Sequence, residues 1–346
     1  MNSILFIISI TIPLLIGFLA IRVAEGKKQI FCLSEKLVLS FPFGAGITAF
    51  YLFYISILGF NITIISTIPL FILSVLGILK FRQLKSKSSI YAVFKEKGCA
   101  DKNSWKKTAL LGFFGIVIAW KLFFMFFNAT VIPPFFDDAI TCWSYKAKVI
   151  YFNKSIELDP NNPLFLGGAY SHYPLGPSLF RVWISLIMGG WHESYIQLHS
   201  FIMLLCLVLF IFISLREYVS FFTRLISCYL IVSIPLLSIH AHAGYADIIL
   251  SYYITVGFIL FIKWFFAKEN NILIIAAASM AAAIFTKNEG LVLYLPAALI
   301  TLSYYCYKIA MKLDEKIKAV SIYMLTLCIV GGPWIVFKIV YSIPLW

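Results

Sequence analysis

Long apolar runs separated by short polar segments make up most of the chain. Each run has few or no charges and about 20 residues, the length that crosses roughly 30 Å of hydrocarbon as an α-helix. The weak alternating pattern of a membrane β-barrel is absent. The pattern predicts ten membrane-spanning helices, at residues 3–21, 37–59, 61–79, 109–127, 197–214, 225–240, 248–265, 271–286, 290–307 and 319–341. We therefore expect an all-α polytopic membrane protein.

One apolar segment is too short to span comfortably. Residues 177–190, PSLFRVWISLIMGG, carry Arg181 near their centre. If this segment lies in the membrane interface, most of the 28 lysines and arginines fall on the cytoplasmic side, including those of the basic loop 80–107. If it spans, the later loops invert and most of that bias disappears. The positive-inside rule favours an interfacial helix, so the long loop 128–196 is predicted to face outward.

Composition supports the membrane assignment. The chain is 62% hydrophobic and 12% charged, with a mean hydropathy of +0.94, which is outside the usual range of soluble domains. The net charge of +13 follows the predicted topology and the basic loop has no nucleic-acid-binding module, so we expect no nucleic-acid partner. The first run lacks the basic start of a signal peptide and is expected to be a retained span. The seven cysteines are scattered singly, with no CxxC pair.

The predicted outer face collects the polar chemistry, beginning with Asp137 and Asp138. These acids follow a predicted span and precede an amphipathic segment that we expect to lie along the membrane surface. Asp138 would suit a helix N-cap, and Asp137 would favour the positive end of the helix dipole. Two adjacent carboxylates at the hydrocarbon boundary are also costly to desolvate, which indicates a partner or a function.

A second motif, SHYPLGP at residues 171–177, lies further along the same outer loop. Its prolines are typical of a turn before a helix. His172, together with Arg181, Lys146 and Lys148, would also place hydrogen-bond donors and cations at the depth of lipid headgroups. Such a set suits a lipid-linked phosphate.

Two further outer segments carry ionisable side chains. HAHAGYAD contains His240 and His242 and ends at Asp247, a set that would serve as metal ligands, position a substrate or cap a helix. TKNEG contains Lys287 and Glu289, which form either a hairpin tip or part of a site. The sequence therefore allows, without requiring, a bound divalent metal ion, and it indicates no other cofactor.

In these motifs the chain resembles the GT-C superfamily of integral-membrane glycosyltransferases, which includes the protein O-mannosyltransferases and the bacterial aminoarabinose transferase. The acidic pair in that family's first outer core loop is matched by Asp137 and Asp138. Its His/Lys-Pro-Pro-Leu type motif is resembled by residues 172–177, with Tyr173 in place of the first proline. A further acid in the second outer core loop is matched by Asp247.

The resemblance implies a division of the chain and an activity. Residues 1–108 would be three additional spans with the basic loop, and residues 109–346 a catalytic module with the family's seven-helix core. The implied reaction moves a sugar from a polyprenyl-phosphate-linked donor to an extracytoplasmic glycan, lipid or protein acceptor. Asp137 would be the general base, and inversion follows from single displacement. Asp138 and Asp247 would orient the acceptor or hold a divalent cation.

The expected location is the plasma membrane of a bacterium, with the site facing outward, because isoleucine and lysine are abundant as in AT-rich bacterial genomes. Membrane lipids are expected partners. A flippase for lipid-linked saccharides is one alternative, and a polysaccharide polymerase or ligase another. Transporters place ionisable residues near the membrane midplane, where only Lys121 is a candidate. The transferase hypothesis requires Asp137 and Asp247 to approach one another at an outward cavity.

Overall fold

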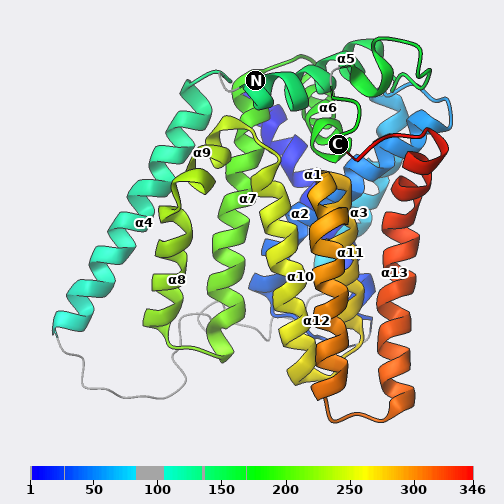
Figure 1. The fold of residues 1–346 in the computed structure, drawn as a ribbon. Coiled ribbons are helices and arrows are strands. Elements are labelled where there is room, and N and C mark those ends of the chain that lie inside the picture. Colours follow the sequence, from blue (N-terminus) through cyan, green and yellow to red (C-terminus); the bar gives the residue numbers. More distant parts are fainter. Residues whose placement is uncertain (1, 27, 83–104, 135–136, 169, 346) are drawn as a thin grey trace.

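The computed structural model describes residues 2–26, 28–82, 105–134, 137–168 and 170–345, and this part of the chain is helical without a strand (Figure 1). Most of the predicted basic loop lies outside the described residues. The first half contains α1 (Asn2–Glu25), α2 (Leu33–Ile57), α3 (Ile68–Arg82), α4 (Trp105–Val131), α5 (Tyr145–Asn153) and α6 (Gly176–Met188). The second half contains α7 (Glu193–Ser214), α8 (Phe221–Ser233), α9 (Pro235–Ala243), α10 (Asp247–Ala267), α11 (Asn271–Thr286), α12 (Leu295–Lys308) and α13 (Leu313–Val340).

Fewer of the described helices have the length and composition of a membrane span than the ten predicted. In the described chain, eight helices are long and apolar enough to cross a membrane, or nine if the bent pair α8 and α9 counts as one span. The shortfall is α11, which has 16 residues and is therefore only about 24 Å long. Most residues of α11 are buried among other helices, so its ends do not have to reach the lipid headgroups.

The predicted span 225–240 is a broken helix. Helices α8 and α9 meet at an angle of 66°, and Ile234 between them has an extended backbone. Pro235 explains the break, because proline lacks an N–H and disfavours helical geometry in the preceding residue. The Ser238 hydroxyl donates to the carbonyl of Val232 at 3.0 Å and satisfies one group that the break exposes.

Figure 1 shows that the connections between helices gather at two ends of the bundle. One carries α5, α6, the turn between α9 and α10, and the C-terminal tail; we call it the site end. The other carries the connections between α1 and α2, α7 and α8, α10 and α11, and α12 and α13; we call it the basic end. Among the described residues, the predicted outer loops lie at the site end and the predicted cytoplasmic loops at the basic end.

The N-terminal helices share a hydrophobic core with the rest of the chain. Both α1 and α2 contact α6 and α11, and α2 also contacts α7. The indole N–H of Trp183 in α6 donates to the Ser9 carbonyl of α1 at 2.8 Å, and Tyr253 of α10 donates to the Pro42 carbonyl of α2 at 2.6 Å. Nearly all of α6 is buried, so it packs inside the bundle end and does not lie on its surface as expected for an interfacial helix.

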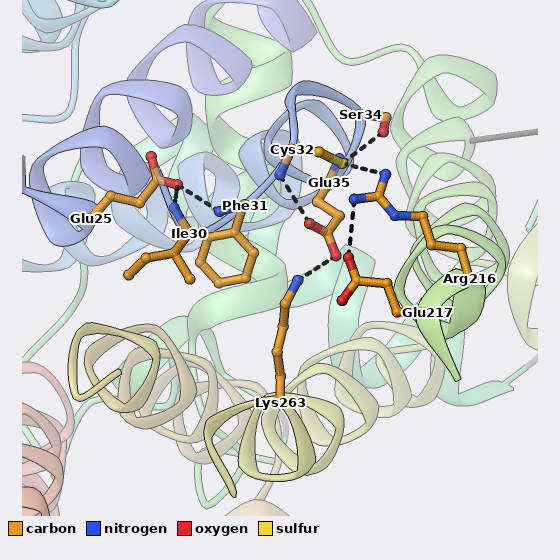
Figure 2. A network of polar contacts seen from close by, with 9 residues as sticks. All are labelled: Glu25, Ile30, Phe31, Cys32, Ser34, Glu35, Arg216, Glu217 and Lys263. Carbon is orange, nitrogen blue, oxygen red and sulfur yellow. Dashed lines mark hydrogen bonds and ion pairs between the residues drawn. The ribbon is translucent and has the colours of Figure 1, made fainter. Parts of the chain in front are cut away.

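At the basic end, the buried carboxylate of Glu25 joins α1 to α2 (Figure 2). It accepts from the backbone N–H groups of Ile30 and Phe31 at 3.1 and 2.8 Å. Two cations also reach it, Arg22 at 2.8 Å and Lys36 at 2.9 Å. A buried charge with this many partners is satisfied, so Glu25 has a structural role.

Figure 2 also shows how α2 is fixed to the later helices at this end. Glu35 and Cys32 form a reciprocal cap at the start of α2, and Glu35 pairs with Lys263 of α10 at 2.6 Å. Arg216, just after α7, donates to the Cys32 sulfur at 3.2 Å. These contacts hold the N-terminal helices in one orientation relative to the helices that carry the candidate site.

Candidate functional site

The acidic pair begins the helix that crosses the site end. Asp137 and Asp138 are exposed and lead into a π-helical segment, Ala139–Ser144, that continues as α5. Asp138 has helical backbone angles and makes no capping hydrogen bond with its side chain, so the predicted N-cap is wrong. Because the helix already includes both acids, their carboxylates remain available to other groups. Single π turns often occur at functional sites.

The acid at the start of α10 belongs to a compact ion cluster. Lys287, between α11 and α12, lies with its Nζ 3.0 Å from Oδ1 of Asp247 and 3.2 Å from Oε1 of Glu289. Burial lowers the pKa of Lys287, but the two carboxylates outweigh burial and raise it above its ordinary value. Two carboxylates around one ammonium leave a net negative charge at this point.

An imidazole and a phenol ring lie beside this cluster. Nδ1 of His240 is 3.9 Å from Oδ2 of Asp247, and the imidazole stacks on Tyr245 with ring centroids 4.4 Å apart and an angle of 13°. Tyr245 follows α9, whose C-terminal turn ends at Gly244 with a positive φ. The sequence offered His240 as a candidate metal ligand, whereas Tyr245, within the same HAHAGYAD motif, was not predicted to contribute.

The acidic pair and the ion cluster meet at two tyrosines. Burial raises the pKa of Tyr245, and the carboxylates of Asp138, Asp247 and Asp137 raise it further. Tyr173 also has a raised pKa, with burial as its largest cause. The charge of Lys287 lowers this pKa, and the carboxylates of Glu289 and Asp138 raise it.

Side-chain packing also brings the segment after the acidic pair next to the start of α10. Cys142 and Trp143, one turn after the acidic pair, form a buried cluster with Ala246, directly before Asp247, and Tyr173 packs against it. The rings of Trp143 and Tyr173 are 5.3 Å apart. Segments about a hundred residues apart in sequence therefore bring their carboxylates to the same end of the bundle.

Two of the predicted headgroup-binding cations are buried and have structural partners. Arg181 donates to the Ser144 hydroxyl at 2.8 Å and to the Gly244 carbonyl, so it joins α6 to both halves of the site. Lys146 donates to the carbonyls of Tyr170 and Tyr173, each at 3.0 Å. Burial lowers the pKa of Lys146 to about 7. Neither cation reaches the surface as the sequence suggested.

The remaining predicted binding residues divide between the site and its surroundings. His172 stacks against Tyr173, 4.4 Å between ring centroids, and burial lowers its pKa. Lys148 pairs with Glu193 at 2.5 Å and lies over Trp191, away from the acids.

The Nδ1–H group of His242 donates to the Ser238 carbonyl within its own helix, at 2.8 Å. Among the described residues, no group of three or more His, Cys, Asp or Glu side chains could hold a metal ion. The ammonium of Lys287 lies between Asp247 and Glu289, where a shared cation would otherwise sit. The carboxylates can hold an acceptor hydroxyl and take its proton, and Lys287 fixes the position of two of them.

Two residues that the sequence did not single out as ligands support the loop around His172. Lys338 of α13 donates to the His172 carbonyl at 3.0 Å and to the Asn288 amide oxygen at 2.9 Å. Asn288 itself donates to the same His172 carbonyl and to the carbonyl of Leu345. A lysine inside an apolar helix was the available signal for Lys338, since such residues are rare and usually functional.

Comparison of the chain with family models, curated proteins and solved structures finds no significant match. The case for a function therefore depends on the residues and their geometry.

Proposed function

We propose that this protein is a membrane glycosyltransferase that uses a polyprenyl-phosphate-linked sugar and acts at the site end of the bundle. The observation that carries the proposal is the convergence of Asp138 and Asp247 on Tyr245, with Tyr173 beside them. Carboxylates from two distant segments, exposed at one end of an apolar bundle, suit a reaction on a lipid-borne substrate. The sequence motifs that resemble GT-C enzymes supply these same acids.

In the proposed reaction, a carboxylate of the acidic pair removes the proton from an acceptor hydroxyl. The hydroxyl oxygen forms a bond to the anomeric carbon, and the bond from that carbon to the phosphate oxygen breaks with its electron pair going to the phosphate. Polyprenyl phosphate leaves and the anomeric centre is inverted. General-base catalysis of this kind contributes about 10² to 10⁴-fold.

The two acids of the pair are not equivalent in position. The charge of Asp138 acts on both Tyr173 and Tyr245, whereas that of Asp137 acts on Tyr245 more weakly than Asp138 or Asp247 does. The sequence assigned the base to Asp137. The thiol of Cys142, which packs against Ala246, lies 4.0 Å from Oδ1 of Asp138. We therefore propose Asp138 as the base, with Asp247 held by Lys287 to orient the acceptor.

The test is sugar transfer by the purified protein in lipid vesicles, with a polyprenyl-phosphate-linked sugar and a panel of acceptors. The rate of transfer is measured as the release of polyprenyl phosphate. Asp138→Asn is expected to lower the rate at least 100-fold, in line with loss of a general base. Asp159→Asn, an exposed acid of the same loop that bonds only to Asn161, is the matched control and should retain activity. Full activity of Asp138→Asn would refute the assignment.

A flippase for lipid-linked saccharides is the second candidate, and the break between α8 and α9 favours it. Discontinuous helices are common at the binding sites of transporters. A flippase would move a labelled lipid-linked saccharide across the bilayer without releasing polyprenyl phosphate. The same vesicles distinguish the two activities.

A further inference from the structure

A second polar feature lies under the C-terminal tail, separate from the acids. A cavity of about 310 Å³ is bounded by Leu291, by Ile335, Lys338 and Ile339 of α13, and by residues 342–345. Helix α13 packs mainly against α11, and Ile339 is 72% exposed at the edge of the cavity. The walls are apolar apart from Lys338 and Ser342. The cavity therefore combines a hydrocarbon-like surface with one buried cation.

Lys338 has no counter-charge. Its side chain is almost fully buried, and no carboxylate of the described residues forms an ion pair with it. Its ammonium donates to two neutral oxygens, the His172 carbonyl and the Asn288 amide. A lysine ammonium has three donors, so one remains for a ligand. A buried cation held only by neutral groups favours an anion in the adjoining space.

Lys146 is a second buried cation of the same kind. It also donates only to backbone carbonyls, those of Tyr170 and Tyr173, and forms no ion pair in the described part of the chain. Lys146 and Lys338 thus hold neighbouring carbonyls of one loop, at Tyr170, Tyr173 and His172. Lys146 does not line the cavity, so the ammonium that adjoins it is that of Lys338.

We propose that the cavity binds the phosphate of a polyprenyl phosphate at Lys338, with the isoprenoid chain lying along Ile335 and Ile339. This inference rests on the proposed function for the identity of the carrier. A phosphate monoester carries close to two negative charges at neutral pH. A phospholipid diester, like the sugar-linked donor, carries one charge on its phosphate. The monoester that sugar transfer releases carries the larger charge and is therefore the better match for the uncompensated ammonium of Lys338.

The test is lipid binding to the purified full chain, measured by native mass spectrometry in detergent. The probes are a C55 polyprenyl phosphate, the C55 polyprenol without phosphate, phosphatidylglycerol and inorganic phosphate. Polyprenyl phosphate is expected to bind roughly tenfold or more tightly than polyprenol, as one charge-assisted hydrogen bond provides. Lys338→Met should remove most of that preference, and Lys338→Arg should keep part of it.

A second pair of variants tests the cavity without changing Lys338. Ile339→Trp fills the mouth of the cavity and is expected to weaken binding of both C55 lipids. Val336→Trp, at a comparably exposed position of α13 that does not line the cavity, is the matched control and should bind as the unchanged protein does.

Each other outcome overturns the inference. Equal binding of phosphatidylglycerol and polyprenyl phosphate would indicate a general anionic-lipid site. Displacement of the lipid by inorganic phosphate alone would indicate a free-phosphate site. An unchanged preference in Lys338→Met would exclude Lys338 as the contact. Because this measurement needs no catalysis, polyprenyl phosphate binding with full transfer activity in Asp138→Asn would refute the proposed base and leave the cavity site intact.

Discussion

Nζ of Lys287 lies 3.0 Å from Oδ1 of Asp247, and this contact joins the start of α10 to the connection after α11. It also sets the orientation of Asp247, which directly follows the Ala246 that packs against Cys142 and Trp143. Lys287 therefore organises the site even if it never touches a substrate.

Replacing Lys287 by Met should destabilise the protein, because Asp247 and Glu289 would then face one another without a cation. We expect a loss of about 1–3 kcal/mol, the usual cost of leaving charged hydrogen-bonding groups unpaired. Thermal unfolding in detergent measures it. Lys148→Met is the control, because its pair with Glu193 is more exposed and should contribute less than about 1 kcal/mol. Equal effects of the two variants would contradict the role of Lys287.

The buried Lys146 should make stability depend on pH. Burial lowers its pKa from 10.5 to about 7. Between these values the unfolded chain binds more protons than the folded chain, so stability rises as pH increases through this window. The cost of burying the charge is fully present below pH 7. The slope is at most about 1.4 kcal/mol per pH unit.

Melting temperatures across that window measure the slope, and Lys146→Met should flatten it. Lys148→Met, which changes a half-exposed lysine two residues away, should leave it in place. An identical slope in the unchanged protein and in Lys146→Met would show that Lys146 does not titrate as described.

Gly290 allows the segment after Glu289 to lie directly on α11. A Cβ atom at this position would come within 2.4 Å of the Ala283 carbonyl oxygen. Gly290→Ala should therefore displace the π-helical segment Gly290–Tyr294 and lower stability by about 1–3 kcal/mol, the usual cost of overpacking. Gly332→Ala is the matched control, since no atom lies within 4 Å of its added Cβ. A stable Gly290→Ala protein would contradict the close packing at this point.

Most of the helical architecture follows from the sequence, because apolar runs of membrane-spanning length have one stable conformation in lipid. All ten predicted spans contain helix, and the charge pattern predicts which loops share an end of the bundle. The exceptions depend on tertiary packing. The sequence does not reveal that α11 is surrounded on nearly all sides, so that 16 residues suffice. Pro235 was visible in the sequence, and its effect on α8 and α9 was missed.

The candidate site could be predicted in part for a related reason. Outer loops of a membrane bundle meet at one surface, so the location of Asp138 and Asp247 at the same end follows from topology. Topology does not determine which cations point outward, because a short helix can pack with either face against the bundle. Arg181 and Lys146 were expected at headgroup depth, and the packing of α5 and α6 buries both. Lys338 was overlooked within an apolar helix.

The account depends on the acidic pair lying beside the turn that precedes α10, and cross-linking tests this most directly. In a protein whose native cysteines are replaced by serine, cysteines replace Asp138 and Tyr245, and a protease site is inserted in the exposed loop at residues 159–161. A short bis-maleimide is added before cleavage. The account predicts that the two fragments stay joined, whereas a control with cysteines at Asp138 and at the exposed Tyr218 of the basic end separates. Fragments that separate in both proteins, although a monofunctional maleimide labels every introduced cysteine, would contradict it.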